Sequence, residues 1–243
     1  MADAKISALT NNTTPAYGDM IPLVNVDGAD ETQRTSLGLL QNWVTVDDAW
    51  AYASATTITV PSGAVSRYSI GDKVTLVQTT VKFFYIVGIA DTVLTVTGGS
   101  DYTVANAAIS AIAFSKSVSP VGFPHYFALT GPTWTSSGAA FTNQPTNHDM
   151  YFNLVGNMAT IKGLAQCHAT SGATGVLFAD FVAGQLPVCV TSSIGIAYNL
   201  TTYKSGGIYI SSSLPNQLAM TLYDSSTMAT NSEYFWYSIS YRI

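Results

Sequence analysis

The sequence is short of ionic charge. Asp, Glu, Lys and Arg make up 9% of its 243 residues, against about 25% in ordinary soluble domains. Lys and Arg total nine, they are dispersed along the chain, and the net charge is −5. A nucleic-acid partner requires a cluster of basic residues that contacts phosphates. The sequence has no such cluster, so we expect no nucleic acid among its partners.

Scarce charge also bears on assembly. A chain with few ionic groups has limited means of keeping its surface in contact with water. Interfaces between permanently associated subunits are apolar and poor in charge. We therefore expect much of the surface to be buried between subunits.

Long apolar runs are absent, although hydrophobic residues make up 47% of the chain. No run approaches the roughly 20 apolar residues that span a bilayer, so we expect no membrane span. The first ten residues lack a basic stretch followed by an apolar core, so we expect no secretory signal. The two cysteines, Cys167 and Cys189, are too few for a disulfide scaffold. We expect two buried thiols made in a reducing cytoplasm, and their spacing leaves open whether they are bonded to each other.

Motifs of enzyme active sites are missing. The chain has no Gly-X-Ser-X-Gly, no phosphate-binding loop and no Cys-X-X-Cys. Its histidines are His125, His148 and His168. His148 precedes Asp149 and His168 follows Cys167, but neighbours in a strand point to opposite faces and make poor catalytic pairs. We interpret Cys167 as a buried structural thiol.

The carboxylates give no pair for acid–base chemistry. Asp47 and Asp48 adjoin where a domain begins, whereas Asp180, Asp224 and Glu233 stand alone. Glycoside hydrolysis requires two carboxyl groups at a set separation in a cleft. We predict that the chain is not an enzyme and has no catalytic residue, metal ligand or cofactor. A polysaccharide-degrading enzyme remains a third alternative to the functions given below.

The sequence does contain the pattern of β-strands. Within residues 73–102, Val, Ile, Thr, Phe and Tyr dominate, and these residue types suit a pleated, half-buried surface. The stretch predicts a long strand, a turn near residues 88–91, a second strand and a turn at residues 98–99. Both faces of this hairpin are apolar, and a lone hairpin is not stable in water. We expect it to close into a small barrel or to pack against a neighbour.

The pattern divides the chain into three parts. Residues 1–46 contain a short extended piece and a helix over residues 37–44 that Ser36 caps, with apolar anchors but too little mass for a core. Residues 47–120 predict a small β-barrel-like domain, in which alternation favours a strand over residues 105–114. After a linker over residues 117–124, residues 125–243 predict a jelly-roll-like β-sandwich. The fold class is therefore all-β with an N-terminal extended anchor.

Nine strands are expected in the C-terminal part, each bounded by turn signals. They are residues 126–129, 150–155, 160–167, 175–181, 186–190, 194–199, 207–210, 217–223 and 233–243. The last has the clearest alternation. Phe235, Tyr237 and Ile239 share one face, and Tyr234 and Trp236 share the other.

Two stretches resemble parts of known virus proteins. Ile6-Ser7-Ala8-Leu9, then residues 19–24, then Thr35 leading into residues 37–40, resemble the N-terminal segment of tailed-bacteriophage fibre and minor structural proteins. That family usually has a basic residue before the helix, and Arg34 is the candidate here. Residues 47–120, with their Ala-Ser-Ala-Thr-Thr opening, Thr-Thr-Val-Lys-Phe-Phe-Tyr core and Gly-Gly-Ser-Asp-Tyr turn, are similar to a module that recurs in phage structural proteins.

The resemblance implies a structural component of a bacteriophage virion, namely a fibre, spike or decoration subunit. It implies attachment to capsid, neck or tail proteins through the N-terminal segment, a homotrimer, and a final location in the virion after synthesis in the bacterial host cytoplasm. The side chains expected to make the attachment are Ile6, Leu9, Ile21, Leu23, Leu37 and Leu40.

The alternative function is a receptor-binding adhesin that recognises host surface glycans through the C-terminal domain. Four aromatic residues have Asn, Asp, Ser or Thr near them in the sequence, as aromatic residues that stack on sugars commonly do. They are Trp134, Tyr203, Tyr223 and Trp236. Packing in the core or between subunits is the competing interpretation of these aromatic residues.

Overall fold

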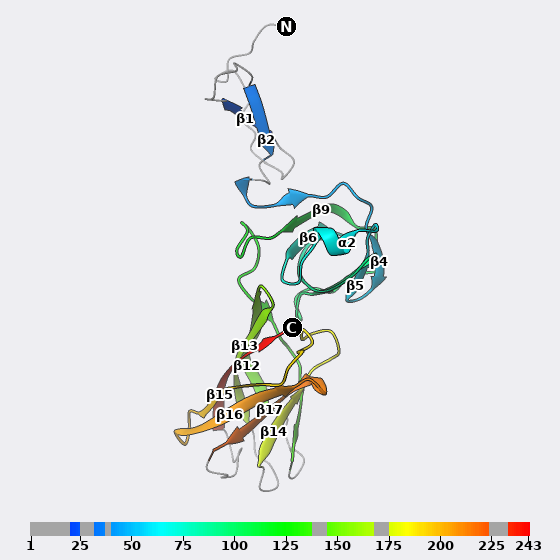
Figure 1. Ribbon diagram of the computed structural model, residues 1–243. Helices are drawn as coiled ribbons and strands as arrows, with labels where there is room; N and C mark the ends of the chain where they lie inside the picture. The colour runs from blue at the N-terminus through cyan, green and yellow to red at the C-terminus, as the bar shows by residue number, and fades with distance from the viewer. Residues whose placement is uncertain (1–19, 25–31, 37–39, 138–144, 168–174, 224–232) are drawn as a thin grey trace.

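The computed structural model describes residues 20–24, 32–36, 40–137, 145–167, 175–223 and 233–243. Nearly all regular elements in these ranges are antiparallel strands, so the predicted all-β class is confirmed. The strands form sheets of two, seven and nine members. Figure 1 shows the three sheets following one another along the molecule, with the N-terminal hairpin at one end and the nine-stranded sheet at the other.

The N-terminal sheet is a hairpin of β1 (Met20–Val24) and β2 (Thr32–Ser36). Their register places Ile21 opposite Thr35 and Leu23 opposite Gln33. Among the described strands, the two pair only with each other. This hairpin is therefore a separate unit that none of the other described strands extends.

The helix predicted over residues 37–44 does not reach its expected end. Gln41 and Asn42 form a turn, and Val44 begins β3 (Val44–Thr45). Asn42 has φ 65°, the left-handed conformation in which helices commonly terminate. Residues 37–39 lie outside the described part of the chain.

The seven-stranded sheet curls into a half-barrel with helix α2 (Ala64–Arg67) beside it (Figure 1). Its strand order is β3, β9 (Ser110–Ser115), β6 (Lys73–Val77), β7 (Val81–Ala90), β8 (Val93–Thr97), β5 (Thr57–Thr59) and β4 (Ala51–Ser54). The strand predicted over residues 105–114 forms only in its second half, as β9, and residues 105–109 lie outside it.

Both faces of the central strands are used, as their two-sided apolar pattern predicts. One face fills the half-barrel with Val74, Leu76, Phe84 and Ile86. The other face packs Phe83, Tyr85 and Val87 against the core of the nine-stranded sheet. The hairpin thus closes a small sheet and also packs on a neighbour.

The long strand predicted from residue 73 onward is broken by a turn at residues 78–80. The Gln78 N–H donates to the Thr80 carbonyl at 3.2 Å. The Gln78 side chain donates to the Ala105 carbonyl at 2.7 Å and accepts from the Ala105 N–H at 2.9 Å. No Gly, Pro, Asn or Asp marks this turn, so the sequence prediction of one strand is wrong here.

The nine-stranded sheet is continuous and antiparallel, and its inner face encloses one core. Its order is β10 (Phe127–Ala128), β12 (Thr146–Val155), β13 (Met158–Cys167), β18 (Glu233–Arg242), β15 (Ser193–Asn199), β16 (Lys204–Ser211), β17 (Leu214–Leu222), β14 (Val176–Asp180) and β11 (Thr133–Ser136). The sandwich-like arrangement arises because the single sheet wraps around that core, with β14, β16 and β17 on the near side in Figure 1.

Eight of the nine strands expected in this part coincide with strands of the sheet. Residues 186–190 do not form a strand, and Pro187 in their middle has no N–H for a ladder. Strand β11 was not expected. In β18 the predicted alternation holds, because Phe235, Tyr237 and Ile239 are buried while Trp236 is exposed.

The two larger sheets share an aromatic core, and the expected linker over residues 117–124 takes part in it. Phe123 is buried and lies 5.0 Å from Tyr85 between ring centroids. The Trp43 indole N–H donates to the Val121 carbonyl at 2.8 Å. The segment therefore packs between the sheets as part of a joint.

Candidate functional site

The described residues contain no group of three or more His, Cys, Asp or Glu side chains that could hold a metal ion. His125 is exposed in a loop. The register of β12 and β13 steps from Asn147 to Asp149, so His148 is the extra residue of a β-bulge. His168 lies outside the described part of the chain. His125 therefore belongs to no such group among the described residues.

The two cysteines are free and buried. Burial raises the pKa of the Cys167 thiol from 9.0 to about 12, and the negative charge of Glu233 contributes in the same direction. Burial also raises the pKa of the Cys189 thiol. A thiol held neutral is a poor nucleophile, so both cysteines are structural groups of the core.

The four aromatic residues predicted to stack on sugars separate into two groups. Trp134 is buried, because β11 alternates and this position points into the core. Tyr203 and Tyr223 are 79% and 68% exposed, and Trp236 is also exposed. The structure therefore contradicts a sugar-stacking role for Trp134 and leaves the other three accessible.

Tyr203 and Tyr223 lie at the same end of the nine-stranded sheet. Tyr203 is in the turn that joins β15 to β16, with φ 59°. The Tyr223 N–H donates to the Ser205 carbonyl at 3.1 Å, two residues beyond Tyr203. A Cβ on Gly207 would lie 3.4 Å from the Tyr223 ring, so the ring rests over this glycine on the outer face of the sheet.

This end of the sheet is the one far from the half-barrel. The opposite end is marked by the pair Met158 and Arg242, next to Gly156, which contacts Gly71 of the half-barrel. The register of β13 and β18 runs from that pair to Cys167 opposite Glu233. The exposed tyrosines thus form the candidate binding tip, together with Trp236.

An apolar stripe on β15 was not predicted from the sequence. Ile194 and Ile196 are 80% and 60% exposed, while Ala197 on the other side of the strand is buried. A Cβ on Gly195 would overlap backbone atoms of β18, so that side of the strand has no room for a larger residue. The signal in the sequence is the alternation of large Ile194 and Ile196 with small Gly195 and Ala197, since small residues on one face indicate close packing there.

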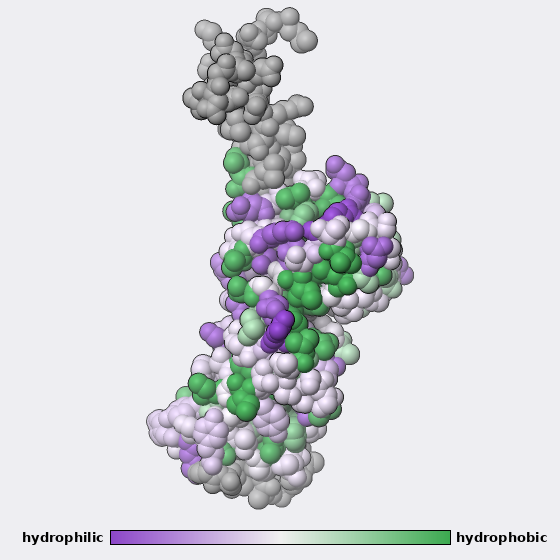
Figure 2. All heavy atoms as spheres, viewed as in Figure 1, coloured by the Kyte–Doolittle hydropathy of each residue, from purple (hydrophilic) through white to green (hydrophobic). Residues whose placement is uncertain are grey.

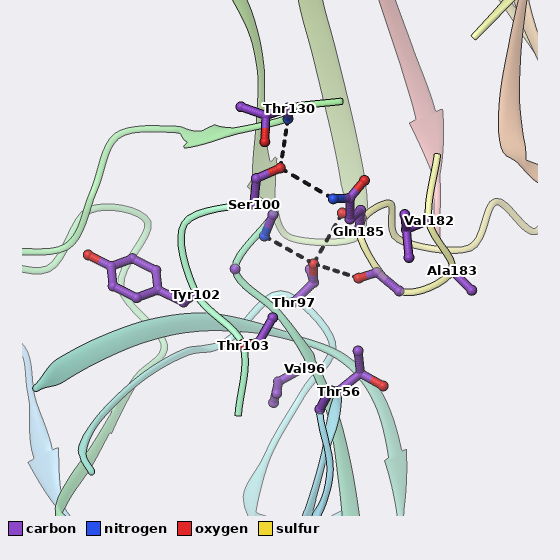
Figure 3. Close-up of a pocket in the computed structure, with 14 residues that line it drawn as sticks. Thr56, Val96, Thr97, Ser100, Tyr102, Thr103, Thr130, Val182, Ala183 and Gln185 are labelled. Atoms are coloured by element: carbon purple, nitrogen blue, oxygen red, sulfur yellow. Dashed lines mark hydrogen bonds between the residues drawn. The ribbon is translucent and has the colours of Figure 1, made fainter. Parts of the chain in front are cut away.

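A pocket of about 280 Å³ lies between the half-barrel and the loop that follows β14 (Figure 3). The Thr97 hydroxyl donates to the carbonyl oxygens of Gly184 and Gln185 at 3.2 and 3.3 Å. The Thr130 N–H donates to Ser100 Oγ at 2.6 Å. These bonds tie the two sheets together at the floor of the pocket.

The lining of this pocket is neutral. It consists of Thr, Ser, Gly, Ala and Val residues with Tyr102 and Gln185, and it includes no Asp, Glu, His, Cys, Lys or Arg. The Gln185 amide oxygen is buried without a hydrogen-bond donor. Groups of this kind can hold a small neutral molecule or fix the joint, and the lining contains no carboxylate, imidazole or amine that could activate its hydroxyl groups.

The predicted attachment residues fall largely at the margin of the described structure. Ile6, Leu9 and Leu37 lie outside the described residues. Ile21 and Leu23 are in β1. Leu40 is exposed at the start of the described chain that continues into the half-barrel.

Comparison with known proteins identifies no relative, because the chain matches no protein-family model, no curated protein and no solved structure. None of the helices in the described ranges is both long enough and apolar enough to cross a bilayer.

Proposed function

We propose that this chain is a structural component of a bacteriophage virion, a fibre, spike or decoration subunit that attaches through residues 1–46 and projects a trimeric β domain. Its partners are two further copies of itself and the capsid, neck or tail proteins of the particle. The observation that carries the proposal is the isolated N-terminal hairpin. Strands β1 and β2 pair with each other and with no other described strand.

A two-stranded hairpin is marginally stable by itself in water. The hairpin has an apolar strand, with Ile21, Leu23 and Val24 within five residues. Leu40 and Val44, which follow it, are also exposed. Such a segment gains stability when it docks on another protein, and a virion surface supplies that support in this proposal.

The rest of the chain suits a rigid projecting unit. The half-barrel and the nine-stranded sheet share one aromatic core, and the Ser100 N–H donates to the Ala128 carbonyl of β10 at 2.8 Å. The pocket at the joint has no carboxylate, imidazole, thiol or amine in its lining, and burial holds the Cys167 thiol neutral. The proposed mechanism is therefore docking and burial without turnover.

The test is to locate the protein on intact particles by electron microscopy, using antibodies against residues 125–243 and particles of the phage that encodes the chain. The proposal predicts label on purified virions at one defined site. Deletion of residues 1–39 should abolish that label while the remaining chain stays folded, because Trp43 and the shared core are retained. Particles that carry no label would contradict the proposal.

The second candidate is the adhesin, which the exposed Tyr203 and Tyr223 at the far end of the sheet favour. Aromatic faces on a protein tip can stack on sugar rings of a host glycan. A glycan array with the full chain would test this. Binding that is lost in the Tyr203→Ala, Tyr223→Ala double variant and kept in Tyr126→Ala, an exposed tyrosine near the joint, would support it; an array without signal would oppose it.

A further inference from the structure

We propose that the outer face around β15 is the surface by which copies of this chain meet, and that its occupant is the same face of sister copies. The inference rests on the proposed trimer and adds the surface that builds it. We define the β15 face as Ile194, Ile196, Tyr198, Tyr209 and Trp236.

These five side chains form one continuous surface. In the β15–β16 register Ile194 lies opposite Tyr209. In the β15–β18 register Tyr198 lies opposite Trp236. All five point away from the core, because Ala197, Ile208 and Tyr237 next to them in the chain are buried. Side chains directly opposite on adjacent strands lie about 5 Å apart and touch.

The shape of this face favours sister copies around an axis. Strand β15 is the middle member of the nine, and the sheet wraps around its core, so β15 lies along the crest of a convex surface. Ile196 is flanked across the sheet by Gly207 and Ser238. The Tyr223 ring lies over Gly207, and Ile196 is still 60% exposed. Three convex surfaces can meet along this strand at a threefold axis, whereas one broad flat partner would touch only the crest.

The charge pattern defines the chemistry of the occupant. Outward positions on β15, β16 and β17 carry no Asp, Glu, Lys or Arg. Lys162 and Arg242 point outward on the neighbouring strands β13 and β18, where they border the face. Figure 2 shows the nine-stranded sheet mostly in pale and green tones, with few strongly hydrophilic residues on the side it presents. A face without charge has nothing to attract nucleic acid or an anionic membrane, and it is complementary to an equally neutral face.

The size of the face can be set against the area that association needs. Strands lie about 4.8 Å apart and rise about 3.4 Å per residue, so the three strands of the β15 face cover roughly 245 Å² over five residues, and β15 with two strands on each side covers roughly 570 Å² over seven residues, before side-chain relief is counted. Specific interfaces bury about 600 Å² or more per partner. An exposed Ile contributes most strongly when it is covered, because the hydrophobic effect grows with the apolar area removed from water. The β15 face is thus the apolar centre of the proposed contact, and the outer sides of the flanking strands β13 and β17 complete its area.

The experiment measures the mass of the full chain by light scattering in three forms. These are the natural sequence, the Ile194→Ser, Ile196→Ser double variant, and a Val65→Ser, Val118→Ser control whose two valines are 64% and 65% exposed on the half-barrel side of the molecule. The proposal predicts an assembly for the natural sequence and for the control. The Ile variant should dissociate at a concentration at least tenfold higher than the natural chain. Both changes replace exposed side chains, so the folded subunit should persist.

Cross-linking gives a second readout. The Ile196→Cys variant should join copies through a short bis-maleimide, and Val65→Cys should not, while buried Cys167 and Cys189 stay unreactive. One outcome separates the surface from the trimer: the natural chain and the double Ser variant assemble equally well, and Ile196→Cys links copies no better than Val65→Cys. In that case the assignment of the interface to the β15 face is wrong, and the trimer proposal is unaffected. If the natural chain is a monomer, both the trimer and this face are wrong.

Discussion

Tyr85 of the half-barrel and Phe127 of the nine-stranded sheet pack edge to face, with ring centroids 5.3 Å apart. Phe152 of β12 adds a third ring, 5.8 Å from Phe127 and 6.1 Å from Tyr85. The two sheets are therefore stabilised by the same buried side chains. A substitution of one of these rings should therefore lower the stability of both sheets.

Phe127→Ala should lower the free energy of unfolding by about 3–5 kcal/mol, the usual cost of removing a buried aromatic ring. Unfolding should remain a single transition, because the missing ring weakens both sheets at once. The control is Tyr126→Ala. The Tyr126 ring is exposed, with its centroid 4.7 Å from that of Tyr151, so its removal should lower the free energy of unfolding by about 1 kcal/mol. Calorimetry that resolved two transitions, only one of them shifted, would show that the sheets are energetically independent.

Gly71 of the half-barrel lies directly against Gly156 in the β12–β13 turn. It has φ 92°, and a Cβ at this position would overlap the carbonyl of Gly156. Gly71→Ala should therefore suffer both backbone strain and a clash with main-chain atoms that cannot rotate away.

Gly131→Ala is the matched control, because Gly131 has φ 72° and nothing within 4 Å of a Cβ. The free energy of unfolding of this control should fall by about 1–2 kcal/mol, because alanine is strained in the left-handed conformation. Gly71→Ala should lose about 1–3 kcal/mol more than the control. If chemical denaturation showed the same loss of unfolding free energy for both variants, the contact between Gly71 and Gly156 would be able to rearrange without an energetic cost.

Stability should fall at alkaline pH. The pKa of Cys167 rises from 9.0 in the free thiol to about 12 in the folded protein because of burial, and burial also raises the pKa values of Tyr237 and Tyr241. These groups stay neutral in the folded state while the unfolded chain loses protons. Their contribution is complete below pH 9 and is lost progressively as the pH rises toward 12.

For Cys167 alone the loss should be roughly 1 kcal/mol for each pH unit above about 9. Cys167→Ala should be less stable at neutral pH and show a shallower decline between about pH 9 and about pH 11. Urea unfolding at several pH values measures both. Unchanged stability across that range, or alkylation of the native thiols at its lower end, would contradict the expected burial of the neutral form.

Alternation in the sequence was sufficient to predict most strands and failed at identifiable places. In β18 large residues occupy every second position along the strand, so the strand and its inner face were clear. Gln78 makes its turn through its own side chain and Ala105, a long-range contact that no local pattern encodes. Residues 186–190 form a short apolar run like that of a buried strand, but Pro187 has no N–H to donate to a neighbouring strand.

The candidate site was harder to predict because a strand pattern separates two faces without saying which is inward. Trp134 was a candidate for sugar stacking with core packing as the alternative, and it is buried, since β11 closes one edge of the sheet over the core. Ile194 and Ile196 resemble core residues in sequence, but they are among the most exposed large hydrophobic side chains of the described residues. Only the pairing of β15 with β16 and β18 shows that Gly195 and Ala197 take the inner side.

The central claim is that this charge-poor chain covers its apolar surface with sister copies. Native mass spectrometry of the purified full chain, repeated over a dilution series, tests it most directly. The account predicts a folded species at three times the 25.7 kDa mass of one chain, persisting to low concentration. A folded, monodisperse species at 25.7 kDa would contradict it.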